Sequence, residues 1–144
     1  MQGFPHHYLT SASGGTEGNV VVGGEGLPDL DTQGPPQFGG PEGMWSPETM
    51  LSAAVANCFI LSFRAIARAS KFEWTSLECN VDGILDRPER TTFFVGFNIH
   101  AVLNVPDDSR LEMAQRLLEK AEKICLITAS LKSEIVLTTD IRVD

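Results

Sequence analysis

Hydrophobic and polar residues alternate along three stretches in the second half of the chain, which predicts three β-strands there. The first stretch covers residues 77–85 and the second covers residues 93–105. The segment DRPER lies between them, so we expect these two strands to form a hairpin that ends at Pro106. The third stretch, residues 134–143, closes the chain. The inward faces are predicted to carry Leu77, Cys79, Val81 and Leu85; Phe93, Val95, Phe97, Ile99, Ala101, Leu103 and Val105; and Ile135, Leu137, Ile141 and Val143.

A long helix is predicted to begin at Ser46-Pro47-Glu48. Serine is a preferred N-cap, proline suits the first helical position, and a glutamate in the first turn meets the positive end of the helix dipole. The helix should run to about Ser70. Its middle is apolar on all sides, which predicts a central buried helix.

A second, amphipathic helix should follow Pro106 and be capped by Asp108 or Ser109. Its hydrophobic residues recur at steps of three and four, which places Cys125 on the side that faces the core. The predicted buried face carries Leu111, Ala114, Leu118, Ala121 and Cys125.

The first 45 residues are rich in glycine and proline. Residues 20–22 are strand-like, whereas residues 26–45 are interrupted too often for a helix and are expected to form an ordered loop packed on the body of the protein. The order of elements predicts an α+β fold, with antiparallel sheets covering two central helices. We expect residues 1–144 to form a single domain, with N-terminal strands and loop in 1–45 and helix, hairpin, helix and strand in 46–144.

Composition and charge exclude several classes of function. The 144 residues are 42% hydrophobic and 21% charged, which is ordinary for a globular chain. A net charge of −8 argues against nucleic acid or an anionic membrane as partner, since both select basic surfaces. Residues 49–63 are uncharged but fall short of the 18 or so expected of a membrane span.

Neither a basic start nor an apolar core marks the N-terminus as a signal peptide, so we expect a cytoplasmic protein with reduced thiols. The three cysteines and three histidines are not spaced as metal ligands, and no nucleotide-binding fingerprint is present. The sequence therefore predicts neither a metal nor a cofactor.

Two cysteines carry the candidate chemistry. Cys58 lies inside the uncharged run TMLSAAVANCFILSF, and Cys125 closes the amphipathic helix. A thiol in a dry helix, with a second thiol able to reach it, is sufficient to reduce a peroxide and to resolve the product as a disulfide. Free cysteines are also common packing residues, and this is the expected role of Cys79, which alternates with Leu77 and Val81.

The stretch PPQFGGPEGMWSPETMLSAAVANCFILSF and the later LLEKAEKICLITASL together resemble the OsmC/Ohr family of organic hydroperoxide reductases. The resemblance implies a cysteine peroxidase without metal or cofactor, built as an intertwined homodimer with active sites at the subunit interface. It implies that Cys58 is the peroxidatic thiol, that Cys125 is the resolving thiol and that Glu48 helps to organise the site. It also implies a dithiol reductant of the dihydrolipoyl type.

The chain departs from the family in how Cys58 would be ionised. Only a thiolate attacks peroxide, and an ordinary cysteine is roughly 3% ionised at neutral pH. Burial should raise the pKa of Cys58 further. The family uses an arginine from the N-terminal segment, whereas the first arginine here is Arg64, largely on another helical face. His6 or His7 as imidazolium is one replacement, and reactivity would then fall above a pH of about 6.5.

A second departure lies after the resolving cysteine, where the family often has proline and this chain has Leu126. We expect little consequence for the chemistry. Glu48 and Cys58 are ten residues apart, about 15 Å along an unbroken helix. For Glu48 to serve Cys58, the helix must break or the glutamate must come from the other subunit. Otherwise Glu48 is only a first-turn helix residue.

The expected substrate is an organic hydroperoxide with an apolar tail, because apolar residues flank the thiol and more are available from the loop. The alternatives are an OsmC-like protein that binds a small hydrophobic ligand or senses oxidants slowly, and a structural dimer whose thiols only pack. The residues that would favour an apolar tail are Phe59, Ile60, Leu61, Phe63, Phe38, Met44 and Trp45.

Overall fold

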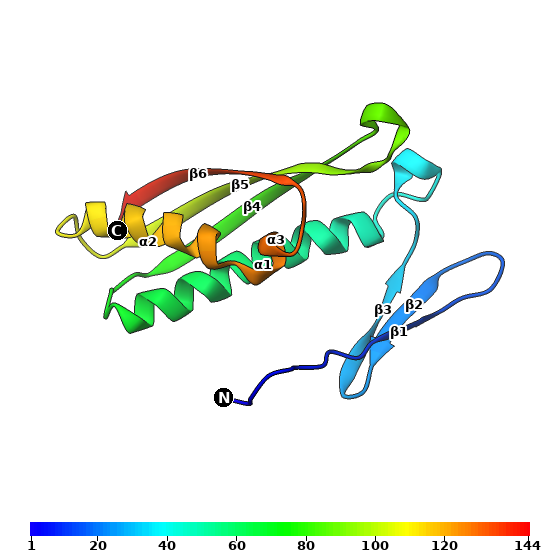
Figure 1. The fold of residues 1–144 in the computed structure, drawn as a ribbon, viewed down its shortest axis with the longest axis horizontal. Coiled ribbons are helices and arrows are strands. Elements are labelled where there is room, and N and C mark those ends of the chain that lie inside the picture. The colour runs from blue at the N-terminus through cyan, green and yellow to red at the C-terminus, as the bar shows by residue number, and fades with distance from the viewer. The chain divides into compact units, whose positions relative to one another are not determined.

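A three-stranded antiparallel sheet organises the first of two units in the structure, a computed structural model that describes residues 1–144. This unit covers Met1–Met50, and the second covers Leu51–Asp144. The strands of the first sheet are β1 (Ser11–Ser13), β2 (Val20–Gly24) and β3 (Leu27–Thr32), in that order (Figure 1). A single 3-10 turn, Pro36–Phe38, follows β3.

The prediction of a loop over residues 26–45 is wrong at β3. Gly24 pairs with Leu27, so two residues close the hairpin between β2 and β3. Gly26 takes a φ of +75°, which a tight hairpin turn requires. The glycines and prolines of this segment therefore mark a hairpin as well as a loop. Gly40, the second residue of the Gly39-Gly40 pair, lies so close to the Gly34 carbonyl that no side chain would fit there.

Helix α1, Pro47–Ala69, starts where the sequence predicts. The Thr49 N–H donates to Ser46 Oγ at 3.1 Å, so Ser46 caps the helix. The prediction that α1 is buried all round is wrong for the single chain, because Leu61 is 53% exposed. α1 is also the one helix long and apolar enough to cross a membrane, which is weak evidence because core helices of soluble proteins pass the same test. Its buried residues are Val55, Phe59, Phe63, Ile66 and Ala67.

The second sheet has the order β4-β5-β6, with β4 at Ser76–Asp86, β5 at Phe93–Val105 and β6 at Glu134–Val143. These bounds confirm the three predicted strands. β4 and β5 form the expected antiparallel hairpin, but β6 runs parallel to β5. The expectation of purely antiparallel sheets is therefore corrected, because a helical crossover returns the chain to the end of the sheet at which β5 began.

Helices α1 and α2 (Leu111–Ile124) cover one face of this sheet (Figure 1), and the core lies between them and the strands. Phe63 packs edge-to-face on Trp74, with ring centroids 5.3 Å apart. Gly83 lets α1 approach β4, since a Cβ there would lie 2.4 Å from Ser52 Oγ. The buried core residues outside α1 are Phe72, Phe97, Ile99, Ala101, Leu103, Val105, Ala114, Leu117, Leu118 and Ala121.

Three details of the predicted core are wrong. Val143, near the end of β6, is 49% exposed and does not belong to the inward face. The register between β4 and β5 shifts at Ile84 and Leu85, so that Phe94 packs against the core in place of Phe93 and Val95. At the start of α2 the predicted cap is absent, and Leu111 is 39% exposed.

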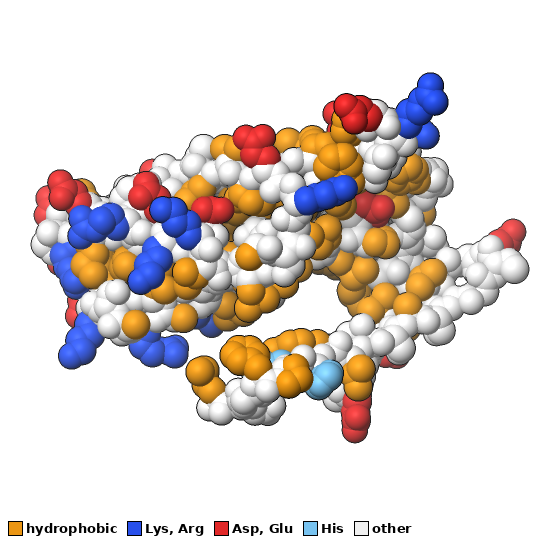
Figure 2. Space-filling model, in the orientation of Figure 1, with side chains coloured by type: hydrophobic (Ala, Val, Ile, Leu, Met, Phe, Trp, Pro, Cys, Tyr) orange, Lys and Arg blue, Asp and Glu red, His pale blue; other side chains and the backbone are white.

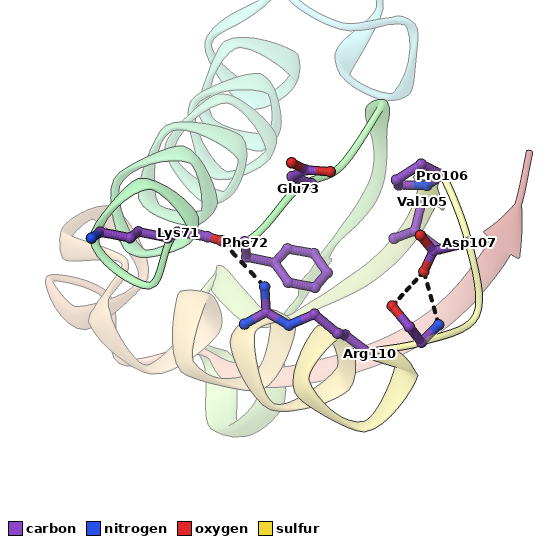
Figure 3. Close-up of a pocket in the computed structure, with 8 residues that line it drawn as sticks. Lys71, Phe72, Glu73, Val105, Pro106, Asp107 and Arg110 are labelled. Atoms are coloured by element: carbon purple, nitrogen blue, oxygen red, sulfur yellow. Dashed lines mark hydrogen bonds between the residues drawn. The ribbon is translucent and has the colours of Figure 1, made fainter.

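The residue at the N-cap position of α2 is Arg110, which makes no side-chain cap. The Asp107 carboxylate instead accepts from the Ser109 N–H at 2.9 Å and holds the turn before the helix. Arg110 lies over the Phe72 ring and donates to the Lys71 carbonyl at 3.2 Å (Figure 3). These residues line a cavity of about 110 Å³ that contains no cysteine.

Hydrophobic side chains remain on the surface of each unit (Figure 2). In the N-terminal unit, Phe4, Tyr8 and Leu9 are almost fully exposed along the segment that precedes β1. In the second unit, Leu61 of α1 and Leu126 stand out, the latter with 67% of its surface exposed.

Candidate active site

The structure brings Cys58 and Cys125 into hydrogen-bonding reach of each other. Cys58 is half-buried in the middle of α1, whereas Cys125 is 1% exposed. Cys125 lies at the end of α2, where an extended residue (φ −61°, ψ 111°) turns the chain into the short helix α3, Leu126–Ala129. Neither thiol forms a disulfide in the structure.

Neutral hydrogen-bond donors surround the Cys58 sulfur. Ser62, one helical turn later, places its hydroxyl 3.8 Å from Cys58 Sγ. The backbone N–H groups of Leu126 and Ile127, at the start of α3, also reach the sulfur, as does the Cys125 thiol.

These donors act on the pKa of Cys58 against the effect of burial. Burial is the largest single influence and works to raise the pKa of Cys58. The Ile127 N–H, the Cys125 thiol, the Ser62 hydroxyl and the Leu126 N–H together outweigh burial, and the pKa of Cys58 is lowered. The expectation that burial would prevail without a cation is therefore wrong, because none of the groups that lower this pKa carries a charge.

Leu126 contributes the smallest of the effects that lower the pKa of Cys58. Its N–H is among the donors to Cys58, and a proline at this position has no N–H to give.

The pKa of Cys125 is shifted in the opposite direction, upward. Burial raises the pKa of Cys125, and its hydrogen bond to Cys58 and the charge of Cys58 add to the effect, although the N–H and hydroxyl of Thr128 act against it. The hydrogen bond between the two thiols lowers the pKa of Cys58 and raises that of Cys125, so the Cys125 S–H is the donor to Cys58 Sγ.

Cys79 is half-buried on the core face of β4 and packs against the core, as its alternation with Leu77 and Val81 suggests. Burial and the charge of Cys125 raise the pKa of Cys79 to about 11. Such a thiol is ionised in roughly one molecule in ten thousand at neutral pH.

We expect iodoacetamide at neutral pH to modify Cys58 first, Cys125 more slowly and Cys79 last, because only the thiolate reacts. Mass spectrometry of tryptic peptides after timed alkylation measures the order. The urea-unfolded chain is the control, in which the three rates should converge. Faster modification of Cys79 than of Cys58 in the folded protein would contradict this assignment.

Glu48 lies in the first turn of α1, and its Oε1 is buried without a hydrogen-bond partner. Since α1 is unbroken from Pro47 to Ala69, a helix break cannot bring Glu48 to Cys58 within one chain. In the N-terminal unit, the His6 ring donates to the Gln2 carbonyl at 3.0 Å and stacks on Phe4, while His7 is exposed. No three His, Cys, Asp or Glu side chains gather to hold a metal ion.

Comparison with known proteins identifies the family. A family model described as OsmC-like protein matches residues 39–140. An OsmC-like protein of unknown function from Vibrio cholerae aligns with a TM-score of 0.84 at 17% identity, over 94% of this chain and 99% of its own. No curated protein matches this chain.

Two of the similar solved structures are described as organic hydroperoxide resistance proteins. The one from Legionella pneumophila has a TM-score of 0.75 at 24% identity, covering 95% of this chain and 97% of its own. The one from Elizabethkingia anophelis has a TM-score of 0.76 at 21% identity, covering 98% and 100%. The predicted α+β, OsmC-like fold is thereby confirmed. The chain belongs to the OsmC-like protein family.

Proposed function

We propose that this protein is a thiol-dependent peroxidase that reduces organic hydroperoxides to alcohols. The observation that carries the proposal is the pair of unlike thiols, which lie within hydrogen-bonding reach of each other, with the pKa of Cys58 lowered and the pKa of Cys125 raised. A peroxidatic thiol and its resolving partner need this difference in pKa. The first must be ionised to attack the peroxide, whereas the second reacts only after the sulfenic acid has formed.

The proposed reaction begins when the Cys58 thiolate attacks the terminal oxygen of the hydroperoxide. The O–O bond breaks, Cys58 becomes a sulfenic acid, and the alkoxide takes the proton of the Cys125 thiol to leave as alcohol. The Cys125 thiolate then attacks the Cys58 sulfur and expels hydroxide, which forms the disulfide. A dithiol reductant, of the dihydrolipoyl type in the family, returns both thiols by exchange.

An apolar substrate tail suits the surroundings of the site. Phe59 and Phe63 are fully buried and belong to the core, so they do not line a substrate path. Leu126 is the better candidate, because its N–H reaches the Cys58 sulfur and its side chain is exposed. Phe38 and Trp45 are exposed on the N-terminal unit and stay candidates.

The proposal includes a homodimer in which Glu48 acts across subunits. Two observations support it: Leu61 leaves an apolar position of α1 uncovered, and a buried Glu48 oxygen lacks a partner. A buried carboxylate oxygen without a partner is costly unless another group completes it. We also propose that the protein works in the cytoplasm, where its thiols stay reduced.

One equivalent of cumene hydroperoxide tests the function. We expect rapid loss of two thiols, with a Cys58–Cys125 disulfide found by mass spectrometry, and no loss in Cys58→Ser. The absence of a cation beside Cys58 favours one competing role, that of a hydrophobic ligand-binding protein or slow oxidant sensor. Unchanged thiols with saturable binding of the peroxide would support that role and contradict the peroxidase.

A further inference from the structure

The hydroxyl of Ser62, inside α1, has a different hydrogen-bond partner from the one usual for a serine in a helix. Such a hydroxyl commonly bonds back to the carbonyl four residues earlier. Ser130, the residue that caps the end of α3, does so, since its hydroxyl donates to the Leu126 carbonyl at 2.8 Å. Ser62 has the same spacing from Cys58, but its hydroxyl pairs with the Cys58 sulfur at 3.8 Å.

The direction of this hydrogen bond depends on the charge of Cys58. A hydroxyl can donate or accept, whereas a thiolate can only accept. When Cys58 is ionised, Ser62 must therefore donate to it. Both residues are half-buried, where the local dielectric is below that of water and a hydrogen bond to a charge is strengthened.

We propose that Ser62 is a positioning residue for Cys58, whose neutral hydroxyl orients the sulfur and holds it as thiolate together with the Leu126 and Ile127 amides, so that no cation is needed. The role of Ser62 in catalysis rests on the proposed peroxidase function, but its effect on the Cys58 thiol does not. Ser62 itself does not touch the reacting oxygen in this scheme.

Neutral donors and a cation leave different signatures. A thiolate held by a cation loses part of that stabilisation as salt screens the charge, whereas hydrogen bonds from neutral donors inside the protein are little affected. Histidine as the activating group would also make reactivity fall above a pH of about 6.5. The neutral arrangement predicts that Cys58 reactivity rises with pH to a plateau, at a midpoint that added salt leaves in place.

The experiment compares wild type, Ser62→Ala, Ser62→Thr and Ser70→Ala. Ser70→Ala is the matched control, because it removes the same hydroxyl just after the end of α1, away from the sulfur. The rate of Cys58 alkylation by iodoacetamide is followed by mass spectrometry across the pH range, at low and high salt. Circular dichroism checks folding, which alanine in a helix should not impair.

We expect Ser62→Ala to slow alkylation at neutral pH by up to about tenfold, the factor for a pKa raised by one unit, and to leave the plateau rate at high pH unchanged. Ser62→Thr, which keeps the hydroxyl, should restore most of the rate, and Ser70→Ala should match wild type. An unchanged profile in Ser62→Ala, an equal loss at every pH, or a midpoint that moves with salt would overturn the proposal.

Alkylation needs no peroxide, so this test is separate from that of the proposed function. A shifted alkylation profile in a protein that consumes no peroxide would leave the role of Ser62 standing and reject the peroxidase. An unshifted profile in an active peroxidase would reject the role of Ser62 alone.

Discussion

Cys125→Ser is expected to consume the first equivalent of peroxide as wild type does and to fail at sustained turnover. The first step needs the Cys58 thiolate and a proton for the departing alkoxide. Water can supply the proton when Cys125 is absent, and serine keeps a hydroxyl donor where the Cys125 thiol donates to the Cys58 sulfur. The second step needs a sulfur held beside the sulfenic acid. An intramolecular partner acts like a very high local concentration, so we expect the loss in steady-state turnover to be about a hundredfold or more.

The Cys58 sulfenic acid that accumulates in Cys125→Ser should also be detectable through its further oxidation. A Cys58 sulfenic acid that finds no partner reacts with further peroxide to the irreversible sulfinic acid. Mass spectrometry should therefore find two added oxygen atoms on the Cys58 peptide after several equivalents of cumene hydroperoxide. Cys79→Ser is the control and should turn over normally, because the pKa of Cys79, about 11, keeps it neutral. Normal turnover by Cys125→Ser would show that Cys125 does not resolve.

Periodicity was a sufficient guide to the second unit, because its elements are long and each buries one face. The alternation in 77–85 and 93–105 matches β4 and β5, and a serine cap followed by proline gives the start of α1. The pairing and register of the strands were not predictable in the same way. The bulge that brings Phe94 to the core, and the parallel placement of β6, depend on pairing between distant residues.

The two cysteines of the candidate site could be predicted from the sequence, but most of the groups that act on Cys58 could not. Helical spacing places the Cys125 side chain toward the core, where α1 also packs, so two thiols could be expected to meet. The groups that lower the pKa of Cys58 include the amides of Leu126 and Ile127, and a backbone N–H has no side-chain signature in a sequence. Ser62, four residues after Cys58, was the one donor that helical spacing alone could have revealed.

Leu61→Asp is expected to convert the proposed dimer into a folded monomer. Leu61 is 53% exposed in the single chain, so a carboxylate there stays in water and should leave the stability of the monomer nearly unchanged. In a dimer that covers this position of α1, the same carboxylate would be buried without a partner, at a cost of several kcal/mol. A cost of about 3 kcal/mol weakens association by more than a hundredfold.

Analytical ultracentrifugation measures the mass, and circular dichroism confirms that the fold is kept. Leu111→Asp is the matched control, because this leucine is 39% exposed at the first position of α2, where an aspartate is favourable. We expect the control to remain a dimer. If Glu48 serves the partner's Cys58, the Leu61→Asp monomer should lose peroxide consumption while its Cys58 still reacts with iodoacetamide. A Leu61→Asp protein that remains a dimer would remove Leu61 from the interface, and a monomeric wild type would require Glu48 to have another role.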